Sequence, residues 1–323
     1  MILFGDRLKN SAAYKSVERD IVSGNIAHAY MLVSPDGKAT GSLIKLIAMR
    51  IFCKKGGCGL CPECKKVLSG NHSDIVYVNA DEGKIGVETV NAMVEDTYIL
   101  SNEGGYKLYF VLSAEQMNAA AQNKLLKTLE EPPENVIIFL AVKNAAAMYD
   151  TIKSRVRTVR LDVFSRQEIY DEIVKTASPE KAATAAACAD GMLGKALDIA
   201  TSETYSEVYD KAFWILLNIT KSKDISSVLN DKVFSKDNFP VLLDVLSVIF
   251  GDVAEVAANP VCAESKQRGD AIKKLAAEFT PKAAAAVIFA LNENRKMLNY
   301  NTSSVSVAEN MLFKILEVKH LCR

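Results

Sequence analysis

Four cysteines within a stretch of twelve residues are the clearest candidates for chemistry in this 323-residue chain. Cys53, Cys58, Cys61 and Cys64 follow the spacing C-x4-C-x2-C-x2-C, and the glycines and proline between them favour tight turns. Four thiolates at such separations can surround one zinc ion and leave no open position for catalysis. A redox-active pair or unrelated thiols are the alternatives, and the two overlapping C-x2-C pairs argue against both. We therefore predict a structural zinc module over residues 53–72, in which His72 could substitute for one cysteine.

The segment Ser34–Ser42, which reads SPDGKATGS, is a second candidate because it joins an apolar run to a helical pattern. A phosphate-binding loop occupies such a position and needs glycines, a lysine for the terminal phosphates and a hydroxyl for magnesium. Lys38 and Ser42 offer the last two groups, but not at the spacing that the motif requires. The alternative is an ordinary turn between strand and helix, and this spacing favours the turn.

The centre of the chain has the pattern of a strand, a helix and a second strand. The apolar runs Lys107–Leu112 and Val136–Val142 have the length and composition of buried parallel strands. Between them, apolar residues recur every four positions from Met117 to Leu129, until Glu130–Pro133 ends the helix. This order predicts a right-handed βαβ unit. Further strands are expected at His28–Val33, at Ile75–Val78 and around Val159.

Charge and composition limit the classes of function. The chain has 39 lysines and arginines against 39 aspartates and glutamates, so no general positive field indicates nucleic-acid binding. No run of 18 apolar residues occurs, and we expect a cytoplasmic protein without membrane contact. Its seven cysteines should then be reduced, which favours metal binding over disulfides.

The residues NAAAQNKLLKTLEEPPENVIIFLAV, followed by TIKSRV, resemble the core of bacterial clamp-loader subunits of the AAA+ class. The resemblance implies an α/β AAA+ nucleotide-binding-like domain over residues 1–162, with a parallel sheet, helices on both faces and the zinc module inserted. It implies a helical lid over residues 163–205 and an all-helical collar for oligomerisation over residues 206–323. Periodic apolar positions from Ser165 onward agree with an all-helical second half.

In register with that family, this chain lacks the groups that bind and hydrolyse ATP. The magnesium-binding aspartate and the catalytic glutamate correspond to Leu112 and Ser113, and the sensor residue corresponds to Val142. Glu115 lies too far along the chain to replace either acid without a shift of register. The resemblance therefore implies that this chain neither binds nor hydrolyses ATP. The degenerate phosphate loop comprises Ser34, Gly37, Ala39, Thr40 and Gly41, in which Thr40 stands where the family has lysine.

The same resemblance implies a catalytic role for Arg155, supported by Ser154. Both belong to the family's Ser-Arg-Cys motif, whose third position is Val156 here. The family's arginine reaches the neighbouring subunit's ATP site in trans, so a subunit without ATP can keep it. The alternative for Arg155 is a surface side chain that caps a helix C-terminus.

Three functions remain open at this point. The resemblance favours an ATPase-inactive subunit of the DNA polymerase III clamp loader, acting with gamma/tau-like and delta-like subunits, the sliding clamp and primed DNA. An active ATP-hydrolysing motor subunit of the same loader is the first alternative, and Thr40, Leu112 and Ser113 argue against it. A stand-alone zinc-containing DNA-binding protein is the second, and the neutral charge argues against it.

Overall fold

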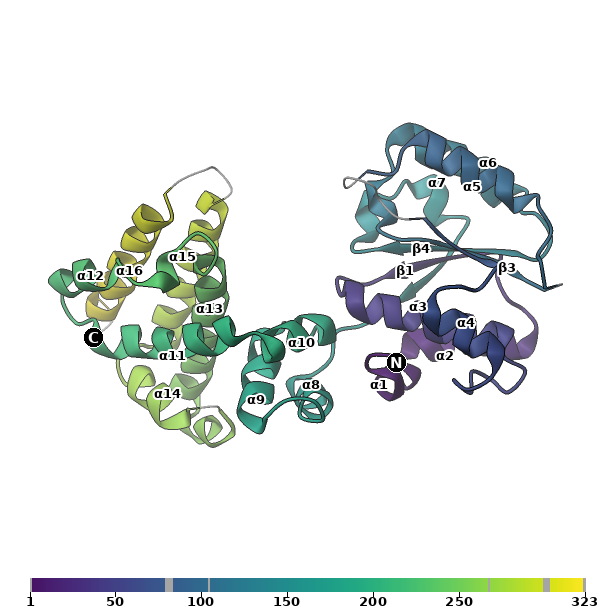
Figure 1. Ribbon diagram of the computed structural model, residues 1–323. Helices are drawn as coiled ribbons and strands as arrows, with labels where there is room; N and C mark the ends of the chain where they lie inside the picture. The colour runs from purple at the N-terminus through teal and green to yellow at the C-terminus, as the bar shows by residue number, and fades with distance from the viewer. Residues whose placement is uncertain (1, 79–83, 104, 267, 299–302, 322–323) are drawn as a thin grey trace. The chain divides into compact units, whose positions relative to one another are not determined.

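The computed structural model describes residues 2–78, 84–103, 105–266, 268–298 and 303–321 (Figure 1). They form two compact units, each with its own buried core. The N-terminal unit comprises Met1–Phe164 together with Met192–Gly194. The C-terminal unit comprises Ser165–Gly191 together with Lys195–Arg323. Among the described helices, none is both long and apolar enough to cross a membrane.

A parallel five-stranded sheet forms the centre of the N-terminal unit, as the sequence predicted. The order β2-β3-β4-β1-β5 puts the first strand between the last two, so that β1 pairs with both β4 and β5. Consecutive parallel strands need crossover connections, and helices provide most of them here. The strands are β1 (Ala29–Val33), β2 (Ile75–Val78), β3 (Lys107–Val111), β4 (Val136–Val142) and β5 (Arg157–Arg160).

Helices cover both faces of this sheet, which explains why its central strands β1, β3 and β4 are buried throughout and almost entirely apolar (Figure 1). On one face, α5 packs against α6 and α6 against α7; on the other, α3 packs against α1, α2 and α4. The first group is α5 (Val87–Thr97), α6 (Ala119–Glu130) and α7 (Asp150–Lys153). The second group is α1 (Gly5–Lys9), α2 (Ala12–Ser23), α3 (Gly37–Phe52) and α4 (Pro62–Ser69).

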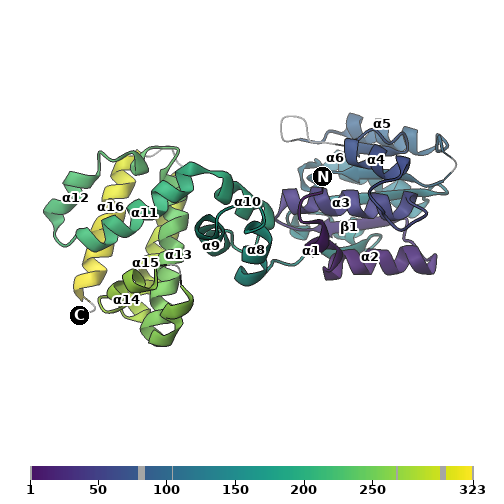
Figure 2. The same cartoon turned by 60° about the horizontal axis from the view of Figure 1, so that its bottom comes forward.

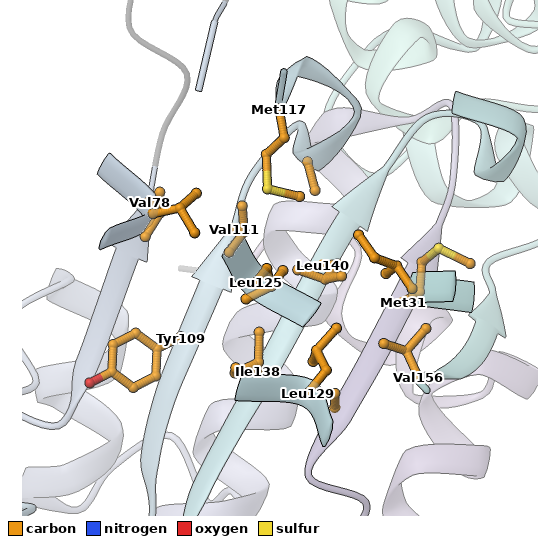
Figure 3. Packing of buried hydrophobic residues seen from close by; sticks show 14 of the residues in the cluster. Met31, Val78, Tyr109, Val111, Met117, Leu125, Leu129, Ile138, Leu140 and Val156 are labelled. Carbon is orange, nitrogen blue, oxygen red and sulfur yellow. The ribbon is translucent and has the colours of Figure 1, made fainter. Parts of the chain in front are cut away.

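The core beneath α6 follows the predicted periodicity. Leu125 and Leu129 of α6 are almost completely buried over Ile138 and Leu140 of β4 (Figure 3). The next residue on the strand points the other way, because successive side chains of a strand alternate. Phe139 accordingly stacks against Tyr30, with 5.1 Å between ring centroids. The two faces of β4 therefore fill two different layers of core.

The described part of the C-terminal unit consists of helices, as the sequence predicted (Figure 2). Helix α13 packs against α15, which also packs against α16. The division that we predicted between residues 205 and 206 lies inside this unit and stays a prediction. The helices are α8 (Arg166–Ile173), α9 (Pro179–Cys188), α10 (Leu193–Thr201), α11 (Glu203–Asn218), α12 (Ser222–Val228), α13 (Phe239–Ala258), α14 (Gly269–Ala276), α15 (Pro281–Leu298) and α16 (Ser304–Leu321).

Two acidic residues of α13 connect the earlier helices of this unit to the later ones. Asp252 is buried and lies 2.8 Å from the Arg166 guanidinium of α8 and 3.1 Å from Nζ of Lys266, which follows α13. Asp244 lies about two helical turns earlier on α13. It pairs with Lys195 of α10 and Arg295 of α15.

Candidate functional sites

The four predicted zinc ligands meet at the junction of two helices. Cys53 caps the C-terminus of α3, and Cys61 caps the N-terminus of α4 through a 3.5 Å contact from the Cys64 N–H. The four sulfur atoms all lie within 4.8 Å of one another. Cys53 Sγ lies 3.7 Å from the sulfur atoms of Cys58 and Cys61, too far for a disulfide. Tetrahedral zinc with bonds of about 2.3 Å separates its sulfur ligands by about 3.8 Å, so the cluster fits this ion.

Backbone geometry and thiol chemistry both agree with a metal at this cluster. Gly57 and Gly59 have φ values of 91° and 74°, in the left-handed region where side chains are strained. The Cys58 N–H, above other contacts, lowers the pKa of Cys53 to about 6, whereas burial raises the pKa of Cys64 to about 12. A buried thiol of this kind becomes a ligand only when a cation beside it stabilises the thiolate. Zinc would supply that charge, held by Cys53, Cys58, Cys61 and Cys64.

His72 lies in a separate group rather than with the cysteines. Its Nδ1 accepts a hydrogen bond from the Asp74 N–H at 3.2 Å, and its Nε2 faces a Glu63 carboxylate oxygen at 3.1 Å. Glu63 and Glu103 also contact the Lys66 ammonium, at 3.4 and 2.5 Å. The Lys66 ammonium therefore already offsets part of the negative charge of this acidic pair. The four cysteines come together without His72.

A pocket of about 220 Å3 lies at the carboxyl ends of β1, β3 and β4. This edge is where ligands bind in open parallel sheets. The structure thus brings together the positions that the resemblance assigned to ATP binding and hydrolysis, although they are far apart in sequence. Glu115, which the register excluded from the catalytic pair, also lines the pocket and accepts from the Lys143 N–H at 3.3 Å. The lining includes Ser34, Gly37, Thr40, Gly41, Leu112, Ser113, Ala141 and Val142.

The phosphate-loop segment is shorter than the sequence suggested. We expected a loop over Ser34–Ser42 before a helix at Leu43, but α3 begins at Gly37. The reason is Asp36, whose side chain accepts a hydrogen bond from the Ala39 N–H at 3.0 Å and caps the helix.

Asp36 also puts a negative charge where a phosphate would bind. Asp36 is buried, and its second carboxylate oxygen accepts a hydrogen bond from the N–H of Gly194. Gly194 belongs to the short segment Met192–Gly194, which is part of the N-terminal unit. Helix N-termini bind anions through free N–H groups and the positive end of the helix dipole. Here a carboxylate of the chain itself takes up part of that capacity. Sequence reasoning missed this residue, although an aspartate directly before a helix is a recognisable capping signal.

Arg155 lies just beyond α7, at the surface of the N-terminal unit. One guanidinium nitrogen, Nη1, donates to the Thr151 carbonyl at 2.8 Å and to the Ser154 hydroxyl at 3.2 Å. The other, Nη2, lies 2.7 Å from Oε1 of Glu130, the last residue of α6. The contact with Thr151 is the one expected of the alternative interpretation, in which Arg155 caps a helix C-terminus. The contact with Glu130 was not foreseen from the sequence.

Comparison of the sequence with known proteins shows which family it resembles. The family model described as "DNA polymerase III, delta subunit" matches residues 9–165. DNA polymerase III subunit delta′ of Bacillus subtilis is 26% identical over 313 residues, covering 94% of each chain. Residues 9–165 therefore belong to the family of that model, and the similarity to a delta′ subunit extends over nearly the whole chain.

Other DNA polymerase III subunits match about half of the chain in sequence, and one solved structure resembles nearly all of it. Subunit delta′ of Yersinia pestis is 34% identical over 151 residues, or 45% of this chain and 44% of that protein. Subunit tau of Escherichia coli is 26% identical over 174 residues, or 53% of this chain and 27% of that protein. A gamma subunit-related protein of Thermotoga maritima has a similar fold, with a TM-score of 0.50 at 15% identity, covering 95% and 99% of the two chains. The predicted family and its α/β fold are therefore confirmed.

Proposed function

We propose that this chain is a delta-prime-like subunit of the DNA polymerase III clamp loader that has no ATPase activity of its own. In this role it presents Arg155 to the ATP site of a neighbouring gamma/tau-like subunit and helps to load the sliding clamp onto primed DNA in the cytoplasm. The full-length similarity to a delta′ subunit supports this choice over an active motor subunit.

One observation carries the proposal most strongly: the pocket at the carboxyl ends of β1, β3 and β4, here called the strand-edge pocket, lies where the family binds nucleotide but lacks the groups for that chemistry. Phosphate transfer in such sites depends on a lysine and a magnesium ion beside the phosphates. Thr40 and Leu112 line the pocket at those two positions, and Asp36 adds negative charge near the N-terminus of α3. ATP carries several negative charges. Lys143 also lines the pocket, but a site without the phosphate-loop lysine and with this carboxylate should bind ATP poorly.

Arg155 suits a role in trans because its present contacts are weak ones. Its side chain is 34% exposed and that of Glu130 is 49% exposed. Exposed ion pairs contribute little to stability because water and salt screen them. A phosphate group at a subunit interface could therefore replace Glu130 as the partner of the guanidinium.

The test begins with ATP binding and hydrolysis by the isolated chain. We expect neither at millimolar ATP, because the cationic groups that hold the phosphates are replaced. Tight binding would contradict the proposal and favour the motor-subunit alternative. Hydrolysis that disappears in Glu115→Gln would contradict it in the same way, and would identify Glu115 as the base.

The second step uses the assembled loader with the other ATP sites inactivated. Arg155→Ala should lower turnover at the facing site by about 10³-fold or more, since an arginine finger stabilises charge that develops in the transition state. Arg160→Ala, which removes an exposed arginine from β5, is the matched control and should leave turnover unchanged. Equal rates for the native and Arg155→Ala loaders would refute the arginine-finger role.

A further inference from the structure

Glu130 holds the proposed arginine finger at a defined place on the surface. The Glu130 carboxylate lies 2.7 Å from Nη2 of Arg155, and Nη1 is bound by the carbonyl of Thr151 and the hydroxyl of Ser154. We propose that Glu130 is a positioning residue that restrains Arg155 in the resting subunit and releases it to the phosphates of the neighbouring ATP site. This inference rests on the proposed function, in which Arg155 acts in trans.

Packed helices determine where both partners of this ion pair lie. Ile152 is completely buried and anchors α7, the short helix that precedes Arg155. Glu130 is the last residue of α6, which packs against α7 through its buried face. Pro132 and Pro133 follow directly and prevent the helix from continuing. The main chain therefore fixes where the two charged groups meet, while the groups themselves stay at the surface.

Glu130 differs from the other two acceptors because it is a charged group on a different helix. Thr151 and Ser154 belong to the same turn as Arg155 and offer neutral oxygens. The Glu130 carboxylate instead offsets the positive charge that the arginine would contribute to catalysis. The nearest other cation on α7, Lys153, pairs with Asp150 at 2.6 Å and does not compete for Glu130.

The exposure of the pair decides whether it can act as a restraint that is released. A buried ion pair would lock the arginine, because breaking it would leave an uncompensated charge in the interior. Both side chains of this pair are exposed to water, so Glu130 orients the guanidinium but can be replaced by another partner at little cost in free energy. Phosphate oxygens form stronger, bidentate contacts with arginine than a single exposed carboxylate oxygen does. The exchange of Glu130 for phosphate is therefore favourable once the neighbouring site is occupied.

The test compares Glu130→Gln with the native chain in the assembled loader, measured without DNA or clamp. The glutamine keeps the size of the side chain and removes its charge, so resting ATP turnover should rise about 2- to 5-fold; 5-fold corresponds to about 1 kcal/mol. Glu131→Gln is the matched control, because Glu131 is an exposed neighbour at the end of the same helix. It should leave turnover unchanged. Glu130→Asp, which keeps the charge on a shorter chain, should return the rate toward the native value.

Two further measurements separate this role from a structural one. The ratio of the Glu130→Gln rate to the native rate should fall toward one as salt is raised, because salt screens an exposed pair. In an Arg155→Ala background, Glu130→Gln should have no effect on turnover. A rate for Glu130→Gln that is equal to or below the native rate would overturn the inference.

The outcomes also distinguish this inference from the proposed function. If Arg155→Ala slows turnover but Glu130→Gln does not raise it, the restraint is wrong and the arginine finger stands. If Arg155→Ala has no effect, the proposed function fails, and the inference fails with it.

Discussion

Asp96 shows how much a single side chain can organise in the N-terminal unit. Its carboxylate lies 2.9 Å from Nζ of Lys107 and accepts a hydrogen bond from the Tyr109 hydroxyl at 2.7 Å. Lys107 is buried at the beginning of β3, and Figure 3 shows the Tyr109 side chain on the same strand. Burial alone would raise the pKa of Asp96, but the contacts from Lys107 and Tyr109 outweigh it and hold that pKa below its ordinary value. The three groups tie α5 to the sheet.

Replacing Asp96 with asparagine should therefore destabilise this unit in a pH-dependent way. A carboxylate whose pKa is lowered by folding stabilises the folded state above its ordinary pKa of about 3.9, and this contribution is lost as pH falls through the folded value. We expect a loss of about 1 kcal/mol at pH 7, a small value because Asp96 is 36% exposed. Denaturant unfolding from pH 7 down to pH 3 measures it, with the exposed Glu95→Gln as the control. A difference that stayed constant below pH 4 would contradict this account.

At the scale of elements, the cysteine cluster joins two helices that a short glycine-rich loop would leave loosely connected. Cys53 ends α3 and Cys61 begins α4, so one bound ion would fix the distance between the two helix ends. Helix α3 also forms the wall of the strand-edge pocket through Thr40 and Gly41. Metal binding at the cysteine cluster would couple to the stability of α3, the helix that carries the degenerate phosphate loop.

Removing the metal should destabilise the N-terminal unit. The chain should purify with one zinc ion, and zinc at 1,000 times its dissociation constant would add about 4 kcal/mol of stability. Cys64→Ser should abolish zinc binding and lower the unfolding midpoint, whereas Cys262→Ser, outside the cluster, should retain the metal.

Lowering the pH toward 5 should release zinc, because the cysteine ligands must be deprotonated to bind it. Metal analysis and thermal unfolding with and without a chelator measure these effects; equal stability of apo and zinc-loaded protein would contradict them.

Sequence patterns predicted the regular elements better than the contacts between them. Strand β4 was predicted with its observed bounds, since a long apolar run flanked by Pro133 and polar residues has one interpretation. The predicted start of α3 was wrong, because Asp36 caps the helix and α3 begins at Gly37, six residues before Leu43. Helices α4 and α12 were not predicted, because both are short and mostly polar.

The candidate sites show the same division between local and non-local information. The cysteine cluster could be predicted because its ligands are close in sequence and their spacing is itself the signal. The ion pair between Glu130 and Arg155 could not, because it depends on how α6 packs against α7. Likewise, the register that excluded Glu115 from the catalytic pair gave no indication that a turn would bring it to the pocket wall.

At the scale of the whole molecule, charge balance bears on how this chain meets DNA. Lysines and arginines equal aspartates and glutamates at 39 each, and several basic residues of the C-terminal unit already pair with acids. Affinity for DNA rises with the number of phosphates that a protein neutralises, together with a dependence on salt. A chain with this balance should therefore contact primed DNA mainly as part of an assembly.

We accordingly expect the isolated chain to bind a primed duplex weakly, with a dissociation constant of about 10⁻⁴ M or higher at physiological salt and a shallow salt dependence. Fluorescence anisotropy across a salt titration measures both quantities. The exposed Lys54 and Lys55 beside the cysteine cluster provide the deciding variant, since a zinc module that bound DNA by itself would use them. Replacing both with alanine should not change this weak binding. Binding tighter than about 10⁻⁶ M that was steep in salt and lost in that variant would instead favour a stand-alone DNA-binding protein, because only a local cluster of cations could produce it in a neutral chain.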